Sequence, residues 1–77
     1  MINFDVKSHF GVLGTKKDKN GEALEVRLCK VSWAGSKPMW DLRCWTADEK
    51  PAKGLTLTDD MMRELKSILT TTDLEAK

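Results

Sequence analysis

The sequence has few residues of the kinds that build metal centres or disulfide frameworks. Its 77 residues include only two cysteines and one histidine. Cys29 and Cys44 can form at most one disulfide, and neither has the CxxC partner or nearby histidine of a zinc site. We therefore expect two buried, reduced thiols, no metal and no cofactor.

Long apolar runs are also missing. No segment approaches the roughly 18 apolar residues of a membrane-spanning helix. The N-terminal residues 1–5 lack the charged region and apolar stretch that mark a signal peptide. We therefore expect a cytoplasmic protein with no membrane partner, in keeping with reduced thiols.

Catalytic arrangements are not apparent either. The chain has no Ser-His-Asp or Cys-His arrangement, no glycine-rich phosphate loop and no metal-ligand spacing. His9 is an isolated histidine with no fixed partner. We expect a protein that is not an enzyme.

The length predicts one domain over residues 1–77 with a small core. A chain this short buries only a little over half of its surface on folding and commonly needs further support. Because disulfides and metals are not expected to supply it, a second copy of the chain is the expected partner.

Periodicity predicts four strands and then one helix. Phe4, Val6, Phe10 and Val12 alternate with polar residues, which is typical of a half-buried strand, and Asn20-Gly21 predicts a hairpin turn. The apolar residues of the last segment recur at helical spacing after Thr58 or Asp59 as N-cap. The expected fold is α+β, an antiparallel meander with strands at about 4–15, 24–33, 39–46 and 54–57 and a helix at about 59–70.

Alternation sorts the second and third strands into two faces. If a three-residue turn joins them, their apolar residues share one face and their arginines and remaining tryptophans share the other. A four-residue turn would mix these sets, because a slip of one residue moves every side chain to the opposite face. We prefer the first register, with Leu24, Val26, Leu28, Trp40, Leu42 and Cys44 as core and Arg27, Trp33, Arg43 and Trp45 opposite.

A face with tryptophan and arginine suits unpaired nucleobases. Aromatic rings stack on bases without reading sequence, and arginine and lysine pair with phosphates. The basic excess lies in residues 1–57, with ten Lys and Arg against seven Asp and Glu, whereas residues 58–77 have three against five. Other readings stay open: Trp33 could cap the edge of the core, and Arg43 could form a surface ion pair with Asp41 or Glu25.

The third strand and the segment after it resemble a known family. Asp41-Leu42-Arg43-Cys44-Trp45, a loop with lysine and proline, and Lys53-Gly54-Leu55-Thr56-Leu57 before an acidic helix start resemble the transcriptional coactivator family called positive cofactor four. The small bacterial, YdbC-like branch is most similar, since it also carries a run like Val31-Ser32-Trp33. The likeness spans about 22–69.

This resemblance implies a curved four-stranded sheet and a homodimer with the helices at its interface. It also implies grooves that bind single-stranded DNA largely without sequence preference, in transcription, replication or repair, and a nucleoid-associated location when DNA is bound. Arg43 matches a DNA-contacting arginine, Lys53 a lysine before the fourth strand, and Lys37 falls near another basic contact.

Two features depart from the eukaryotic members of that family. Those proteins place Tyr-Trp two residues after the arginine, where this chain has Trp45-Thr46. The aromatic residue that stacks on bases is therefore open between Trp45 and Trp33. The serine-rich regulatory arm is missing, so a coactivator role does not follow.

The sequence thus predicts a homodimer that binds single-stranded DNA. The alternatives are an adaptor that binds proteins of the transcription machinery and an RNA-binding module. The expected nucleic-acid-binding residues are Lys16, Lys17, Arg27, Lys30, Trp33, Lys37, Arg43, Trp45 and Lys53. The expected dimer contacts are Met61, Met62, Leu65, Ile68 and Leu69.

Overall fold

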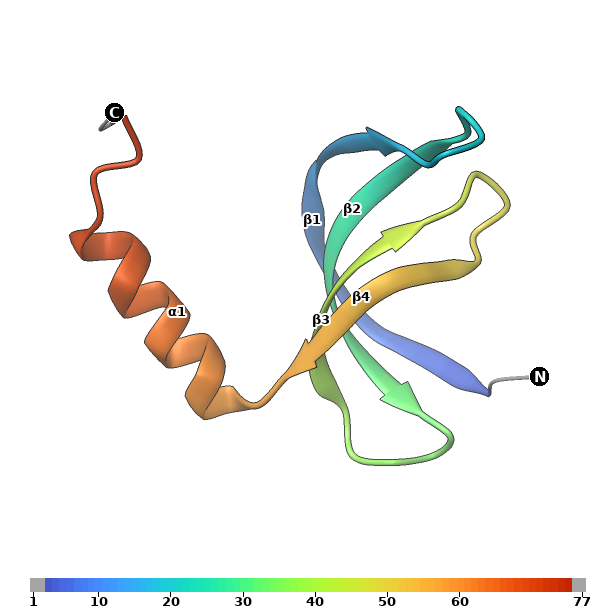
Figure 1. Ribbon diagram of the computed structural model, residues 1–77. Coiled ribbons are helices and arrows are strands. Elements are labelled where there is room, and N and C mark those ends of the chain that lie inside the picture. Colours follow the sequence, from blue (N-terminus) through green and yellow to red (C-terminus); the bar gives the residue numbers. More distant parts are fainter. Residues whose placement is uncertain (1–2, 76–77) are drawn as a thin grey trace.

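The chain folds into a four-stranded antiparallel sheet followed by one helix. The computed structural model describes residues 3–75. The elements are β1 (Phe4–Lys17), β2 (Ala23–Trp33), β3 (Met39–Trp45), β4 (Pro51–Leu57) and α1 (Asp59–Thr71), with the sheet in the order β1-β2-β3-β4. The strands bend together into a deeply curved sheet, and α1 extends away from it (Figure 1). The predicted α+β meander is confirmed.

The strands are longer than predicted at several ends, most of all in β4. This strand begins at Pro51 instead of Gly54, so part of the predicted loop is strand. A register shift between Arg43 and Trp45 lets β4 pair on both sides of the irregularity. Proline is tolerated there because it is the first residue of an edge strand.

Bulges in β1 overturn the expectation that its four apolar residues share one face. The β1–β2 ladder shifts register three times between Val6 and Gly14. Phe4 therefore packs against Trp33, with ring centroids 5.6 Å apart, whereas Phe10 stacks on Trp40 at 4.9 Å on the other side of the sheet. Each inserted residue reverses the alternation and bends the strand.

The β2–β3 register agrees with the preferred three-residue turn. Leu28 pairs with Leu42, Arg27 with Arg43, and Val31 with Met39. The sheet therefore has an inner face, on the hollow of the curve, and an outer face. From β2 and β3 the inner face carries Glu25, Arg27, Cys29, Val31, Trp33, Met39, Asp41, Arg43 and Trp45, and the outer face carries Leu24, Val26, Leu28, Lys30, Trp40, Leu42 and Cys44.

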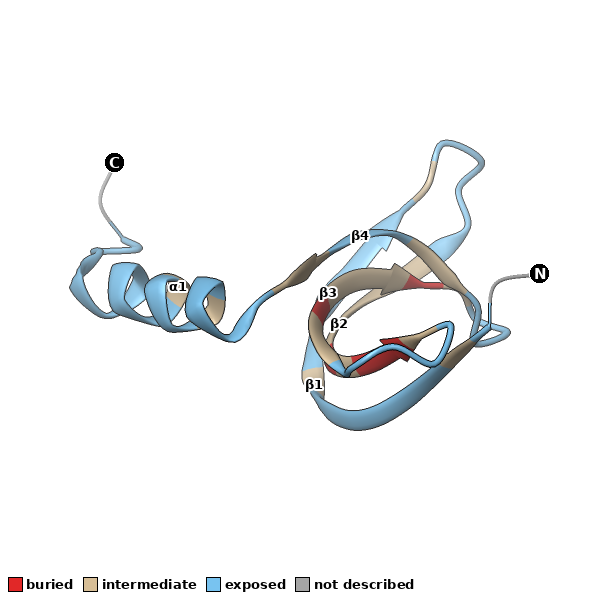
Figure 2. Ribbon diagram, turned by 90° about the horizontal axis from the view of Figure 1, so that it is seen from below, coloured by how far each residue is buried: buried red, intermediate tan, exposed pale blue. Residues whose placement is uncertain are grey.

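Burial is the reverse of the prediction for these two faces. The fully buried residues lie on β2 and β3 (Figure 2), and Cys29, Val31, Asp41 and Trp45 of the inner face are among them. The predicted core residues Trp40, Leu42 and Cys44 are only half-buried. The curvature explains the reversal, because the inner face closes on itself while α1 leaves most of the outer face uncovered.

Local signals define α1. The Thr58 hydroxyl accepts a hydrogen bond from the Met61 amide at 3.1 Å, so the predicted Thr58 cap is confirmed. Asp59 and Asp60 lie in the first turn, near the positive end of the helix dipole. No residue of α1 is buried. Within residues 3–75, no helix is long and apolar enough to cross a membrane.

Candidate functional site

Three aromatic rings lie in a row on the inner face, with a guanidinium group at each end. Phe4 lies between Trp33 and Trp45, with its ring centroid 5.6 and 5.7 Å from theirs. The Arg43 guanidinium lies over the Trp33 ring at 4.7 Å, and that of Arg27 lies 5.5 Å from the Trp45 ring. These distances are those of cation–π contacts. The sheet thus brings together Arg27, Trp33, Arg43 and Trp45 as predicted, and Phe4 joins them.

Arg43 is held by a buried carboxylate. Its Nε and Nη2 atoms donate to Asp41 at 2.9 to 3.0 Å, and its Nη1 donates to the Ala52 carbonyl oxygen at 2.9 Å. Asp41 has no exposed surface. The predicted ion pair between Arg43 and Asp41 is therefore confirmed, but it is buried and not at the surface. A fully buried charge is strongly destabilised when its partner is removed.

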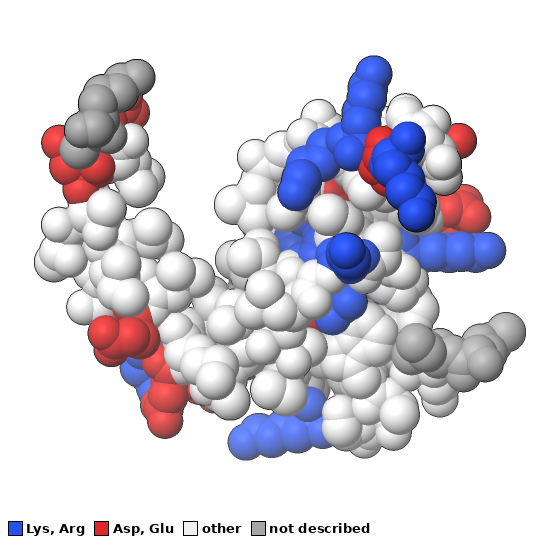
Figure 3. Space-filling view, in the orientation of Figure 1, with Lys and Arg blue, Asp and Glu red and all other residues white. Residues whose placement is uncertain are grey.

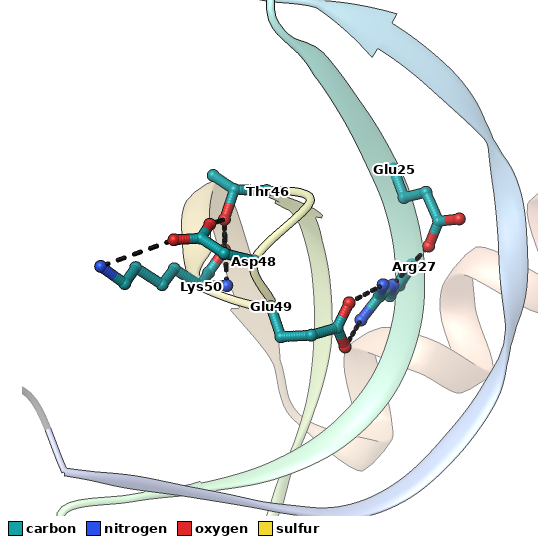
Figure 4. A network of polar contacts seen from close by, with 6 residues as sticks. All are labelled: Glu25, Arg27, Thr46, Asp48, Glu49 and Lys50. Carbon is teal, nitrogen blue, oxygen red and sulfur yellow. Dashed lines mark hydrogen bonds and ion pairs between the residues drawn. The ribbon is translucent and has the colours of Figure 1, made fainter.

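Arg27 pairs with two carboxylates that are more exposed than Asp41. Its Nε donates to Glu25 at 2.7 Å, and its Nη1 and Nη2 donate to Glu49 at 2.9 and 2.8 Å (Figure 4). The Arg27 hydrogen bond is the main cause that lowers the pKa of the Glu49 carboxyl. Glu25 therefore pairs with Arg27, and not with Arg43.

Two indole N–H groups on this face have no acceptor. The Nε1 atoms of Trp33 and Trp45 are buried, and neither has a hydrogen-bond partner in the described part of the chain. Buried N–H donors are normally satisfied, so each such group calls for an explanation. The Trp45 side chain is only 3% exposed, so the expectation that it presents an open ring is wrong for this conformation. Trp33 is half-buried and is therefore the more exposed of the two residues.

Exposed lysines surround the sheet. Lys16, Lys17, Lys37 and Lys53 are exposed, and none forms an ion pair with any residue between 3 and 75. On the side shown in Figure 3, lysine and arginine gather over the sheet, whereas acidic side chains dominate the helix. These lysines are free to contact anions.

Lys30 lies on the outer face, away from the inner-face arginines. Its Nζ is 4.8 Å from the centroid of the Trp40 ring and 3.5 Å from the Asp59 carboxylate. The Trp40 Nε1 donates to the same carboxylate at 2.7 Å. Lys30 therefore does not lie at the predicted site. Together with Trp40, Lys30 connects the sheet to the start of α1 through Asp59.

The described residues that could hold a metal or react as thiols are dispersed. Across residues 3–75, no three His, Cys, Asp or Glu side chains are grouped as metal ligands. Cys29 and Cys44 are both free thiols. Burial raises the pKa of the Cys29 thiol, and the nearby Asp41 charge adds to this effect.

Comparison with known proteins identifies a relative of this chain. No protein-family profile matches the chain. A protein of Treponema pallidum (strain Nichols), described only as uncharacterized, is 32% identical over 75 residues. The alignment covers 96% of this chain and 84% of the Treponema protein. At this identity and coverage, the chain belongs to the same family as that Treponema protein.

Proposed function

We propose that the inner face of the sheet binds single-stranded DNA without sequence preference. The observation that carries the proposal is the row of Trp33, Phe4 and Trp45 with an arginine at each end, in which both indole N–H groups are buried without acceptors. Bases offer both ring faces for stacking and oxygen and nitrogen acceptors for the indoles. A duplex hides its base faces, so this surface favours an unpaired strand.

Trp33 is the first candidate for base stacking. It is half-buried, whereas Trp45 is only 3% exposed. Phe4 lies almost equally close to both rings, so exposure is what distinguishes them. A base stacked on tryptophan contributes about 1–3 kcal/mol. Arg43 stiffens this platform because Asp41 and Ala52 hold its guanidinium against the Trp33 ring.

Phosphates would be held by the lysines and by Arg27. Lys16, Lys17, Lys37 and Lys53 form no ion pairs with the described residues, so they can neutralise phosphates without first losing a partner. Affinity should therefore fall with salt, with a slope of about −0.7 in log K against log salt for each phosphate neutralised on a single strand.

The active form in this proposal is a homodimer formed through α1. Met61, Ile68 and Leu69 are 48 to 53% exposed, although their spacing places them on one apolar face of the helix with Met62 and Leu65. A helix of 13 residues is marginally stable in water without tertiary packing. A second copy of α1 offers matching apolar surface, as a twofold interface requires. Such a dimer would act in transcription, replication or repair.

Fluorescence titration tests the binding proposal. Labelled oligo-dT and the same sequence as a duplex are titrated with the protein at several salt concentrations. We expect tighter binding to the single strand and weaker binding as salt rises. Equal binding to both forms, or none, contradicts the proposal. Preference for poly-U over oligo-dT would instead indicate an RNA-binding module, and salt-insensitive binding to protein alone would indicate an adaptor.

Sedimentation equilibrium tests the dimer separately. We expect the wild-type chain to sediment as a dimer and Ile68→Asp to sediment as a monomer, because a charge in an apolar interface is costly. Lys66→Asp changes charge on the same helix but not at an apolar position, so it serves as the control. A monomeric wild-type protein would rule out the homodimer.

A further inference from the structure

The loop between β3 and β4 places a carboxylate on the inner-face arginine Arg27. Glu49 stands at the tip of this loop and reaches across the hollow of the sheet to β2 (Figure 4). Its two oxygens accept from the two terminal nitrogens of the guanidinium at 2.9 and 2.8 Å. This paired geometry is the one that arginine also uses for phosphate.

The loop is built to present Glu49. The Thr46 amide donates a hydrogen bond to the Lys50 carbonyl oxygen at 2.9 Å, and the Glu49 amide donates to the Thr46 carbonyl oxygen at 3.0 Å. Asp48 accepts from the Thr46 hydroxyl and lies near the Lys50 ammonium. Glu49 itself has a φ of 65°, a left-handed conformation that is uncommon for a residue other than glycine. The network therefore holds Glu49 in an unfavourable backbone conformation that points its side chain at Arg27.

The Arg27–Glu49 ion pair is much more exposed than the Arg43–Asp41 ion pair. The Glu49 side chain is 67% exposed, whereas that of Asp41 has no exposed surface. An anion from solution can therefore replace Glu49 without opening the core. It cannot replace Asp41, because that carboxylate would lose its partner inside the protein.

Glu25 keeps Arg27 ready for such an exchange. It binds the Nε atom at 2.7 Å and leaves the Nη1 and Nη2 edge to Glu49 alone. When Glu49 departs, Glu25 still fixes the direction in which that edge points. A cavity of about 280 Å³ lies beside this ion pair and is lined in part by Thr15, Arg27, Trp45 and Glu49. Space for a phosphate and part of its sugar thus already exists beside the guanidinium.

We propose that the Glu49 carboxylate occupies a phosphate subsite on Arg27 and leaves it when a nucleic-acid strand binds. This inference rests on the proposed function, because the phosphate is that of the bound single strand. Glu49 then lowers the affinity of the groove, since every strand that uses this subsite must first break an ion pair. The same carboxylate also disfavours weakly bound anions, which cannot offset that loss.

Oligo-dT binding by Glu49→Gln tests the subsite. Glutamine keeps the size of the side chain and removes its charge. An exposed ion pair of this kind contributes little, so we expect Glu49→Gln to bind oligo-dT more tightly than wild type, by up to about five-fold. The control is Glu22→Gln, which removes one exposed charge at the same end of the sheet, in the turn before β2 (Figure 1). The control should change affinity by less than Glu49→Gln does.

The same substitutions made in an Arg27→Gln variant test whether the effect of Glu49 depends on its contact with Arg27. In Arg27→Gln, adding Glu49→Gln should change affinity no more than adding Glu22→Gln, because the subsite is gone. Thermal melts establish that all variants are folded. The proposal is supported if Glu49→Gln raises the affinity for oligo-dT when Arg27 is present and does not raise it in the Arg27→Gln background.

The remaining outcomes overturn the proposal in distinguishable ways. Wild-type protein that fails to bind oligo-dT contradicts the proposed function and the subsite together. Wild-type protein that binds, with Glu49→Gln no tighter than Glu22→Gln, refutes the subsite alone. An equal gain in the Arg27→Gln background also refutes it, since the effect would then be one of general charge.

Discussion

Gly54 lies directly opposite Arg43 in the β3–β4 ladder, and no other residue type fits there. A Cβ atom on residue 54 would lie 2.3 Å from the Arg43 Cβ and 2.5 Å from its Cα. It would also lie 2.6 Å from the Leu42 carbonyl oxygen. Because two of these three neighbours are backbone atoms, they cannot rotate away. The close approach lets β4 run against Arg43 while the Ala52 carbonyl oxygen accepts from its guanidinium.

Gly54→Ala should therefore destabilise the fold by about 3 kcal/mol, the upper part of the range for overpacked sites. Chemical denaturation measures the loss. Gly14→Ala is the matched control, because a Cβ there would meet nothing within 4 Å. Equal stability of the two variants would show that β4 can shift away from Arg43 at little cost.

Arg43→Ala should destabilise the protein far more than Arg27→Ala. It leaves Asp41 charged, fully buried and without its guanidinium partner, which costs about 3–5 kcal/mol. Arg27 pairs with carboxylates that are 44 and 67% exposed, so its loss leaves them in water and should cost only about 1 kcal/mol. Urea unfolding of both variants compares the two ion pairs. Similar losses would mean that the Asp41 carboxylate finds another partner.

The three tryptophans should respond unequally to DNA. Trp33 faces the proposed groove, whereas Trp40 lies on the outer face against Phe10 and Lys30. Trp33→Phe should therefore remove much of the fluorescence quenching caused by oligo-dT, and Trp40→Phe should leave it nearly unchanged. Quenching that depends on Trp40 would move the binding surface to the outer face.

Cysteine labelling should distinguish the two faces in the native protein. Cys29 is 1% exposed and its thiol pKa is raised by burial, so little thiolate forms near pH 8. Cys44 is half-buried on the outer face and should react with a thiol reagent first. Mass spectrometry of partly labelled protein identifies the site, and Cys44→Ser provides the control. Rapid labelling of Cys29 would indicate that the inner face opens readily.

Stability should fall in acid as exposed carboxylates lose their partners. The pKa values of Glu49 and Asp59 lie below their ordinary values of 4.5 and 3.8, chiefly because of hydrogen bonds from Arg27 and Trp40. A group with a lowered pKa in the folded state stabilises the protein above its unfolded pKa, and this contribution is lost as pH falls through the folded value. Melting temperature should thus begin to drop below about pH 4.5. Glu49→Gln should show a shallower drop, and an unchanged profile would argue against the Arg27–Glu49 pair in solution.

Local patterns in the sequence were sufficient to predict the four strands, the helix and the register between β2 and β3. Alternating residues, the Asn20-Gly21 turn and the Thr58 cap are short-range signals that act within a few residues. The three-residue turn followed from requiring apolar residues of β2 and β3 to share a face. The bulges in β1 could not be read this way, because each is a local irregularity whose position depends on the partner strand.

The sequence by itself determined which residues share a face, but only the tertiary structure decided which face is buried. Arg27, Trp33, Arg43 and Trp45 were grouped correctly from a period of two, since that period follows from backbone geometry. Burial depends on how far the whole sheet curves and on where the helix goes, and both are properties of distant parts of the chain. Curvature buried Asp41 and Trp45 on the inner face and left the apolar outer face half open. The same curvature carried Glu49 across the hollow to Arg27, a contact between residues 22 positions apart that no local pattern encodes.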